Sequence, residues 1–248
     1  MKTYPLTDTC AKNFDTKNHV CFGISPFNSY FSENQIRYLA QWGRENFRSM
    51  HFFVPDEPSV FTLEALGYST EKAAWKARRQ CQYLFNKIQK ALIQTGFSAE
   101  ESDSMIVNWS KLSENDRFMN LYGDVRGLFE IDPIFQDACL DASRWVLEKR
   151  VPNEESLTEE MLRLAVRYLL AEIPLFIDSA GILGEPSSIF CYHQRVEFIE
   201  ALMKGKYRIG ATVAQGFVVI QPKLAEFQSD STFRSNSSLP TETTLLET

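Results

Sequence analysis

The chain has 248 residues, of which 44% are hydrophobic and 23% charged, and its net charge is −6 at pH 7. These values are typical of a globular protein with one large domain or two small ones, and they argue against bulk nucleic-acid binding. No apolar run approaches the roughly 18 residues that span a bilayer, and the N-terminus lacks the apolar core of a signal peptide, so we expect no membrane partner.

The first part of the chain begins with a polar, irregular segment over residues 1–18, which predicts a loosely attached lead-in. Apolar runs over 19–24 and 50–54 predict buried strands. Between them, helical spacing of apolar residues predicts a helix over 33–48, with a capping box that begins at Ser32. A strand, a helix and a strand within about 35 residues predict a βαβ unit and a parallel sheet.

The next predicted elements are two helices and a strand. A short helix over 59–66 ends at Gly67, because glycine is a common residue just past a helix. A long helix over 71–94 follows, with Thr70 as its cap. The apolar residues 105–109 predict a third strand.

The second half of the chain is mainly helical. Residues 113–150 predict two helices that an Asp-Pro pair separates, and a further helix over 158–173 is predicted to end before Pro174. Gly181 and Gly184 then mark a loop. The last predicted elements are a strand over 187–192, a short helix over 195–204 and a strand over 217–220.

The domain organisation follows from these elements. We predict one α/β domain over residues 19–222, with a mainly parallel sheet flanked by helices, and we find no internal repeat. Residues 223–248 are rich in Ser and Thr and cannot bury a core, so they predict a disordered tail.

The five cysteines are odd in number and widely scattered, at Cys10, Cys21, Cys81, Cys139 and Cys191. They form no CxxC pair, so the sequence indicates neither a disulfide framework nor a zinc site. We therefore expect a cytoplasmic protein without a bound metal.

Ser25 is the candidate nucleophile. It follows a predicted strand, between Gly23 and Pro26, and ligands of open α/β sheets bind at the carboxyl ends of the strands. The N–H groups of the helix that follows could stabilise an oxyanion there. The alternative is that Ser25 only caps a turn.

Tyr168 and Glu172 lie four residues apart and therefore on one helix face, together with Met161 and Ala165. A phenol and a carboxylate on a face that points inward are costly unless they meet a polar group. A buried carboxylate can recognise an ammonium or act as a general base, although a structural hydrogen bond would explain the pair equally well.

His193 directly follows Tyr192 at the end of a predicted strand. Histidine is the natural proton carrier near neutral pH. Its position resembles that of Ser25, because both follow the carboxyl end of a strand, but a single histidine can also be purely structural.

A basic segment lies on the long predicted helix. Residues 71–90 carry six cations against the single acid Glu71, which suits the phosphate backbone of a nucleic acid or a solvated helix face. The cations are Lys72, Lys76, Arg78, Arg79, Lys87 and Lys90.

Three segments together resemble the cyclodipeptide synthases. They are Gly23–Ser32 (GISPFNSYFS), Tyr168–Phe176 (YLLAEIPLF) and Pro186–His193 (PSSIFCYH). The resemblance covers about residues 19–222, and Asn28 with Tyr192-His193 resembles the branch of the family marked by that Asn, Tyr and His. It implies a single Rossmann-type domain similar to the catalytic domains of tyrosyl- and tryptophanyl-tRNA synthetases, which are class I enzymes.

The resemblance also implies a ping-pong reaction on two aminoacyl-tRNAs. Ser25 would take the first aminoacyl group as an ester, and Tyr168 and Glu172 would hold its α-ammonium. The second aminoacyl-tRNA would supply an amine to give a dipeptidyl ester on Ser25, and ring closure would release a diketopiperazine. Glu172, Tyr192 and His193 would position groups and move protons, and the basic helix would face the tRNA.

The same resemblance implies which groups the reaction does not need and which residues select the substrate. Aminoacyl-tRNA is already an activated ester, so neither ATP nor another cofactor nor a metal is implied, while tailoring enzymes could act on the product. The family pattern places Cys21, Gly23, Leu175 and Phe190 along the pocket for the first aminoacyl side chain. Cys21 is smaller and Phe190 bulkier than the residues common there, which leaves the preferred amino acid open.

Three other functions compete with this one. The order Ser25, Glu172, His193 matches that of α/β-hydrolases, but Phe27 stands where their G-x-S-x-G elbow needs its second glycine. An ATP-dependent class I synthetase would need His-x-Gly-His and Lys-Met-Ser-Lys-Ser segments, which the sequence lacks. A non-catalytic tRNA-binding module would use the basic helix without Ser25.

Overall fold

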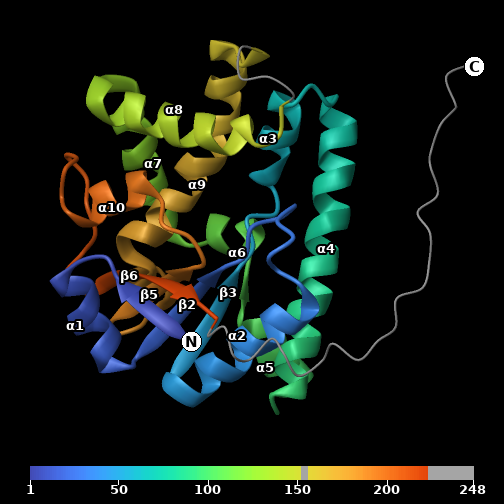
Figure 1. Ribbon diagram of the computed structural model, residues 1–248, viewed down its shortest axis with the longest axis vertical. Helices are drawn as coiled ribbons and strands as arrows, with labels where there is room; N and C mark the ends of the chain where they lie inside the picture. The colour runs from blue at the N-terminus through green and yellow to red at the C-terminus, as the bar shows by residue number, and fades with distance from the viewer. Residues whose placement is uncertain (152–155, 223–248) are drawn as a thin grey trace, which may run out of the picture.

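A six-stranded β-sheet forms the centre of the computed structural model, which describes residues 1–151 and 156–222 (Figure 1). The strands are β1 Lys2–Pro5, β2 His19–Gly23, β3 Ser49–Phe53, β4 Ile106–Val107, β5 Ser188–Tyr192 and β6 Gln215–Gln221. They lie in the order β1-β6-β5-β2-β3-β4, and all neighbours are parallel except β1 and β6. The predicted α/β class and mainly parallel sheet are confirmed.

The helices flank the sheet. They are α1 Asp8–Thr16, α2 Glu33–Asn46, α3 Ser59–Ala65, α4 Thr70–Gln94, α5 Ala99–Ser104, α6 Trp109–Ser113, α7 Asp116–Ile131, α8 Pro133–Glu148, α9 Glu159–Leu183 and α10 Glu197–Met203. α2 and α4 cover one face, and α9 covers the other together with α7, α8 and α10. α3 packs against both α4 and α9, and so joins the two layers at one end of the molecule (Figure 1).

The alternation of side chains along β2 determines where Ser25 points. Phe22 and Ile24 are buried in the core beneath α2 and α4, whereas Cys21 belongs to the core beneath α9. The chain stays extended past the end of β2, because the Ile24 N–H donates to the Phe53 carbonyl. Ser25 therefore faces α9, and its predicted position just beyond the carboxyl end of a strand is confirmed.

The N-terminal segment is an integral part of the sheet, so the prediction of a loose lead-in over residues 1–18 is wrong. β1 pairs with β6, and α1 follows with Thr7 as its cap. Cys10 on α1 is buried, and its Sγ accepts a hydrogen bond from the Phe217 N–H of β6. These contacts join opposite ends of the chain, and local patterning cannot reveal them.

α9 continues well beyond the predicted end at Pro174. The residues on both sides of that proline are fully buried, and this burial outweighs the roughly 3 kcal/mol that a proline costs inside a helix. The helical geometry breaks instead at Asp178, where φ is −157° and ψ is 53°. At this kink the Thr212 N–H donates to the Ile177 carbonyl and satisfies it.

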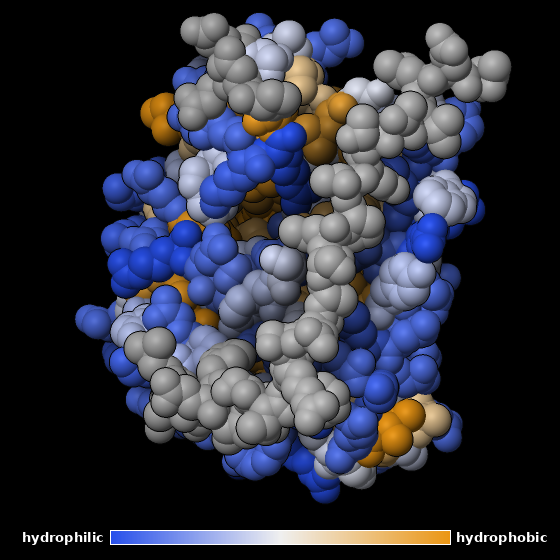
Figure 2. Space-filling model, turned by 45° about the vertical axis from the view of Figure 1, so that its right-hand side comes forward, coloured by the Kyte–Doolittle hydropathy of each residue, from blue (hydrophilic) through white to orange (hydrophobic). Residues whose placement is uncertain are grey.

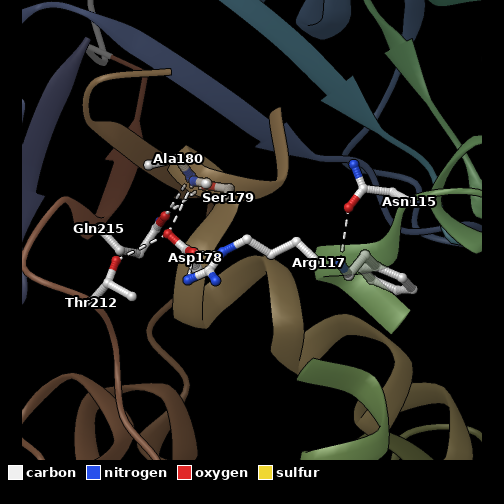
Figure 3. A network of polar contacts seen from close by, with 9 residues as sticks. Asn115, Arg117, Asp178, Ser179, Ala180, Thr212 and Gln215 are labelled. Atoms are coloured by element: carbon white, nitrogen blue, oxygen red, sulfur yellow. Dashed lines mark hydrogen bonds and ion pairs between the residues drawn. The ribbon is translucent and has the colours of Figure 1, made fainter. Parts of the chain in front are cut away.

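A polar network centred on Asp178 holds the kink in place (Figure 3). The buried Asp178 carboxylate forms an ion pair with Arg117 of α7 and accepts hydrogen bonds from the Thr212 hydroxyl and the Gly181 N–H. Gly181 lies inside the helix and not in the predicted loop. A Cβ at Gly181 would collide with both members of the ion pair, so glycine there makes room for the network.

Removing the cation of this network should destabilise the fold. With Arg117→Met, the Asp178 carboxylate stays buried without its counter-charge, and we expect unfolding free energy to fall by about 2–3 kcal/mol. This value lies below that of a fully buried pair, because Arg117 is half-exposed. Urea denaturation checks it, with Arg126→Met, an exposed arginine on the same helix, as the control. Equal stability of the two variants would contradict the prediction.

Two of the three histidines lie at the amino end of the strands, away from Ser25. His51 Nδ1 lies 2.9 Å from His19 Nε2, and His19 Nδ1 lies 2.7 Å from the Ser188 hydroxyl. The chain of hydrogen bonds continues from Ser188 through the Ser179 hydroxyl to the Gln215 amide oxygen. Because this oxygen only accepts, each group in the chain must donate its hydrogen toward Gln215. Burial lowers the pKa of His19 to about 3, and this histidine is therefore neutral and structural.

Some helices and strands begin or end at other residues than predicted, because of the residues that cap the helices. Ser69, and not Thr70, caps α4, because its side chain accepts from the third N–H of the helix. The predicted strand over 105–109 shortens to the two residues of β4, since Asn108 caps α6. α5 was not predicted, although Ser98 begins it with a complete capping box.

The predicted disordered tail over 223–248 lies outside the described residues. Within residues 1–151 and 156–222, no helix has both the length and the hydropathy that a membrane-spanning segment requires.

Candidate active site

A cavity of about 410 Å³ opens at the carboxyl edge of the sheet, beyond the ends of β2 and β5 and between α3, α8 and α9. In Figure 2 a hollow with apolar, orange walls is visible in the upper half of a mainly hydrophilic face. Seven residues singled out from the sequence line the cavity, namely Gly23, Ser25, Asn28, Tyr168, Glu172, Phe190 and Tyr192. The sheet and α9 thus bring together residues that are up to 169 positions apart.

Two phenols hold the Ser25 hydroxyl. Ser25 Oγ lies 3.0 Å from Tyr192 Oη, and Tyr168 also forms a hydrogen bond to Ser25. Burial raises the pKa of both tyrosines, that of Tyr168 well above its ordinary value, so both remain protonated donors near neutral pH. The hydroxyl is therefore fixed in direction and surrounded by proton donors.

Glu172 lies one helical turn beyond Tyr168 and forms a hydrogen bond with it. Both side chains keep some surface exposed to the cavity, yet they lie so deep that lost hydration dominates. Burial raises the pKa of Glu172 to about 8, while the bond from Tyr168 acts in the opposite direction. Glu172 thus holds a proton at neutral pH, and a cation placed beside it would favour the ionised form.

His193 faces Asn28 and not Ser25. Asn28 Oδ1 accepts the Tyr30 N–H, so its amide nitrogen must point toward His193 Nε2, 3.0 Å away. An amide nitrogen only donates, and His193 Nε2 is therefore the unprotonated acceptor. Burial, with a smaller contribution from the charge of Lys149, lowers the pKa of His193 to about 4, so the ring is neutral. The Tyr30 ring stacks on it at 4.0 Å.

Aromatic rings form the floor of the cavity. Phe190 stacks on Phe217 and meets Phe176 edge to face, and all three line the cavity. A Cβ on Gly23 would come within 2.7 Å of the Phe190 ring, so only a glycine at this position leaves room for the ring where it lies.

Two of the four residues predicted to line a substrate pocket do not line this cavity. Cys21 and Leu175 are fully buried in the core beneath α9, whereas Gly23 and Phe190 do line it. The influence of Cys21 and Leu175 on the substrate stays a prediction.

Comparison with known proteins identifies the family. The family model for cyclodipeptide synthases matches residues 1–222. The chain belongs to the cyclodipeptide synthase family. It is an enzyme, because members of this family are tRNA-dependent aminoacyltransferases.

Individual relatives agree over most of the chain. The cyclo(L-leucyl-L-leucyl) synthase of Bacillus subtilis is 31% identical, with 93% of this chain and 92% of the relative covered. A cyclodipeptide synthase structure from Bacillus thermoamylovorans is 32% identical and has a TM-score of 0.82, over 89% of this chain and 95% of that one.

A third comparison relates the fold to another class of enzymes. The Mycobacterium tuberculosis protein Rv2275 is 28% identical, with a TM-score of 0.79, over 89% of this chain and 93% of that one. Its structure was described as demonstrating that these enzymes are related to type I tRNA synthetases. The family match also includes the N-terminal 18 residues, which the resemblance drawn from sequence left out.

The end of α8 contributes residues to the cavity of this cyclodipeptide synthase, and the sequence analysis did not predict them. Trp145, Lys149 and Arg150 line it, and Lys149 Nζ lies 3.3 Å from the centre of the Trp145 ring. The adjacent basic pair at the end of a helix was a visible signal. These two cations give the cavity mouth a positive charge that suits a phosphate-bearing substrate.

Five of the six predicted cations of α4 share one side of the helix, which we call the α4 stripe. Lys87 Nζ lies 3.5 Å from the Phe31 carbonyl, and Lys90 forms an ion pair with Glu33, so this side faces the loop that carries Ser25. Arg79 lies over the rings of Trp75 and Tyr83. The stripe consists of Lys72, Lys76, Arg79, Lys87 and Lys90.

Arg78 does not belong to the α4 stripe. It is one residue from Arg79, which turns it by about 100° around the helix, and its Nε donates to the Ala74 carbonyl. The geometry gives no support to its predicted part in tRNA binding. Within residues 1–151 and 156–222, no group of three or more His, Cys, Asp and Glu side chains could hold a metal ion.

Proposed function

We propose that this cyclodipeptide synthase joins the aminoacyl groups of two aminoacyl-tRNAs through covalent esters on Ser25, in a ping-pong reaction that yields a 2,5-diketopiperazine. The observation that carries the proposal is the Ser25 hydroxyl, which two phenols hold at the carboxyl edge of the sheet next to Glu172. Asn28, Tyr192 and His193 favour the family branch with that signature. A family member from Candidatus Glomeribacter gigasporarum has been solved bound to Phe-tRNAPhe, which supports a charged tRNA as substrate.

The first step is an acyl transfer. Ser25 Oγ attacks the carbonyl carbon of the aminoacyl ester, the bond to the terminal ribose breaks, and the ribose oxygen takes the proton. Tyr168 and Tyr192 can donate hydrogen bonds to the oxygens that gain charge. Glu172 receives the α-ammonium, which favours the ionised carboxylate and releases the proton that the free enzyme holds.

Atom balance determines the direction of the second step. If the amine of the second aminoacyl-tRNA attacked the Ser25 ester, the dipeptide would leave on the tRNA. For a dipeptidyl ester on Ser25, the amine of the bound aminoacyl group must attack the ester carbonyl of the second aminoacyl-tRNA. An amide then forms, the bond to the terminal ribose of that tRNA breaks, and the ribose oxygen takes the proton. This attack reverses the direction expected from the sequence. The ionised Glu172 beside the ammonium can accept its proton, because the burial that raises the pKa of Glu172 in the free enzyme favours the neutral carboxyl group.

The third step closes the ring. The free amine of the dipeptide attacks the Ser25 ester, an amide forms, and the Ser25 hydroxyl regains its proton. The floor of Phe176, Phe190 and Phe217 favours an apolar side chain on the first aminoacyl group. The tailoring enzymes that could act on the product stay a prediction.

A serine hydrolase has less support. Such an enzyme needs a histidine that accepts the proton of the nucleophile. Here Ser25 forms its hydrogen bonds with tyrosines, and the unprotonated nitrogen of His193 faces Asn28.

The proposed reaction is tested by its products. Purified protein, charged tRNAs and mass spectrometry should reveal a diketopiperazine, and radiolabelled aminoacyl-tRNA should leave label on the protein. Leucyl-, phenylalanyl- and tyrosyl-tRNA come first, since the floor of the cavity is apolar. The absence of label and of cyclic product with every charged tRNA would refute the proposal.

The buried cysteines bear on the compartment. All five are free and buried, which supports a reducing environment, and we infer a cytoplasmic enzyme.

The α4 stripe offers a matched test of tRNA binding. Arg79→Ala should weaken tRNA binding several-fold at about 100 mM salt and reduce the slope of log K against log[salt] by about 0.7–0.9, because one phosphate contact is lost. Arg78→Ala removes the same charge from the neighbouring position and should leave the slope unchanged. Filter binding over a salt series measures both. If the two variants weaken binding equally, the helix acts only through its total charge.

A further inference from the structure

Phe27 has an unusual backbone conformation for an aromatic residue. Its φ is 61°, and among the described residues other than glycine only Lys17 also has a positive φ. Lys17 ends α1, where the left-handed conformation is common, whereas Phe27 lies in the loop two residues after Ser25. A bulky side chain in this conformation is strained, and such strain persists only where the surroundings impose it.

The surroundings do impose it here. Asn28 accepts the Tyr30 N–H with its side chain, and its own carbonyl accepts the Phe31 N–H. Asn28 is held in turn by His193. The loop after Ser25 is therefore fixed from Asn28 onward, and Phe27 occupies the corner between Ser25 and this fixed part.

This corner keeps the Phe27 ring available. Phe27 lines the cavity and is 37% exposed, whereas Phe31 is buried and Tyr30 stacks on His193. In the part of the chain that the structure describes, the Phe27 ring takes part in no aromatic pair. An apolar ring is thus displayed at the cavity mouth, beside the nucleophile.

The proposed reaction defines what must lie at this place. The carbonyl that Ser25 attacks is bonded to the terminal ribose of the tRNA, and that ribose carries the terminal adenine. We propose that Phe27 stacks on this adenine and thereby positions the ester in front of Ser25, an inference that rests on the proposed function. Every base offers a flat π-face for such a contact, and one stacked base changes affinity by about tenfold.

The test compares two small donors that lack the tRNA body, so that binding at α4 does not enter. One is 2′(3′)-O-leucyl-adenosine, and the other is the same leucyl ester on 1-O-methylribose, which has no base. The rate at which each donor acylates the protein is followed by intact-protein mass spectrometry, with phenylalanyl esters as a second pair. We expect the wild type to react about tenfold faster with the adenosine ester.

Four variants separate the ring from the backbone. Phe27→Ala and Phe27→Gly should lose the preference for the adenosine ester and keep the rate with the ribose ester. Phe27→Tyr and Phe27→Trp should retain the preference. Phe27→Gly also removes the backbone strain, so this variant should fold at least as well as the wild type.

The outcomes distinguish this proposal from the proposed function. If the wild type takes no label from any aminoacyl-tRNA, the proposed function fails. If it takes label from aminoacyl-tRNA but reacts no faster with the adenosine ester than with the ribose ester, the stacking proposal is overturned. It is also overturned if the protein takes label from aminoacyl-tRNA but from neither small ester, because the terminal adenosine then does not position the ester. The same holds if Phe27→Ala keeps the preference and only Phe27→Gly loses it, because the backbone and not the ring would then be responsible.

Discussion

The Ser25→Ala variant is expected to take no label from charged tRNA and to form product at least about 10³-fold more slowly than the wild type. Every step of the proposed reaction passes through an ester on this oxygen. The fold should be unaffected, because the substitution removes only a hydroxyl at the edge of a cavity. Water in the cavity can replace it as the hydrogen-bond partner of Tyr192 and Tyr168. Labelled aminoacyl-tRNA, acid precipitation and mass spectrometry of the product measure both effects.

Binding of tRNA provides the control for this substitution. Ser25→Ala keeps the α4 stripe and the basic residues at the end of α8, so it should bind tRNA with unchanged affinity and salt dependence. Ser25→Cys, which keeps a nucleophile, should still be acylated, as a thioester that hydroxylamine cleaves. A fully active Ser25→Ala variant would mean that the protein acts without a covalent intermediate.

The predictable part of the site rests on local signals. Gly23 and Pro26 mark the end of the strand before Ser25, and the four-residue spacing of Tyr168 and Glu172 puts them on one helix face. A parallel sheet brings strand ends to one edge, which places Tyr192 and His193 near Ser25, whereas only the family resemblance placed Tyr168 and Glu172 beside it.

Other features depend on contacts that no local pattern contains. β1 exists only because β6 is there to pair with it, and α9 passes Pro174 because the apolar residues around it are buried in the core. The kink at Asp178 needs Arg117 from another helix. The direction in which His193 points follows from one hydrogen bond to Asn28, so the sequence could place this histidine at the site but could not separate its alternatives.

Glu172→Gln is expected to change stability and activity in opposite directions. Burial raises the pKa of Glu172 to about 8 in the folded enzyme, against an ordinary value near 4.5. Between these two values the folded state holds a proton that the unfolded state has released, so stability is lost as pH rises through this window. The loss amounts to at most about 5 kcal/mol, at 1.36 kcal/mol for each pKa unit. Glutamine keeps the shape and cannot ionise, so the variant should lack this loss and exceed the wild type in stability above pH 8.

Activity should fall in the same variant. A neutral amide can neither pair with an α-ammonium nor accept its proton, and general acid–base groups contribute typically about 10²–10⁴-fold. Urea denaturation at pH 6 and pH 9 measures the stability, and the rate of diketopiperazine formation measures the activity. Glu33→Gln serves as the control, because Glu33 is paired with Lys90 at the surface and its pKa is lowered, so no stability is gained at high pH. If Glu172→Gln followed the pH dependence of the wild type, the carboxyl group would be ionised in the free enzyme, and it could not exchange its proton for the ammonium of the substrate.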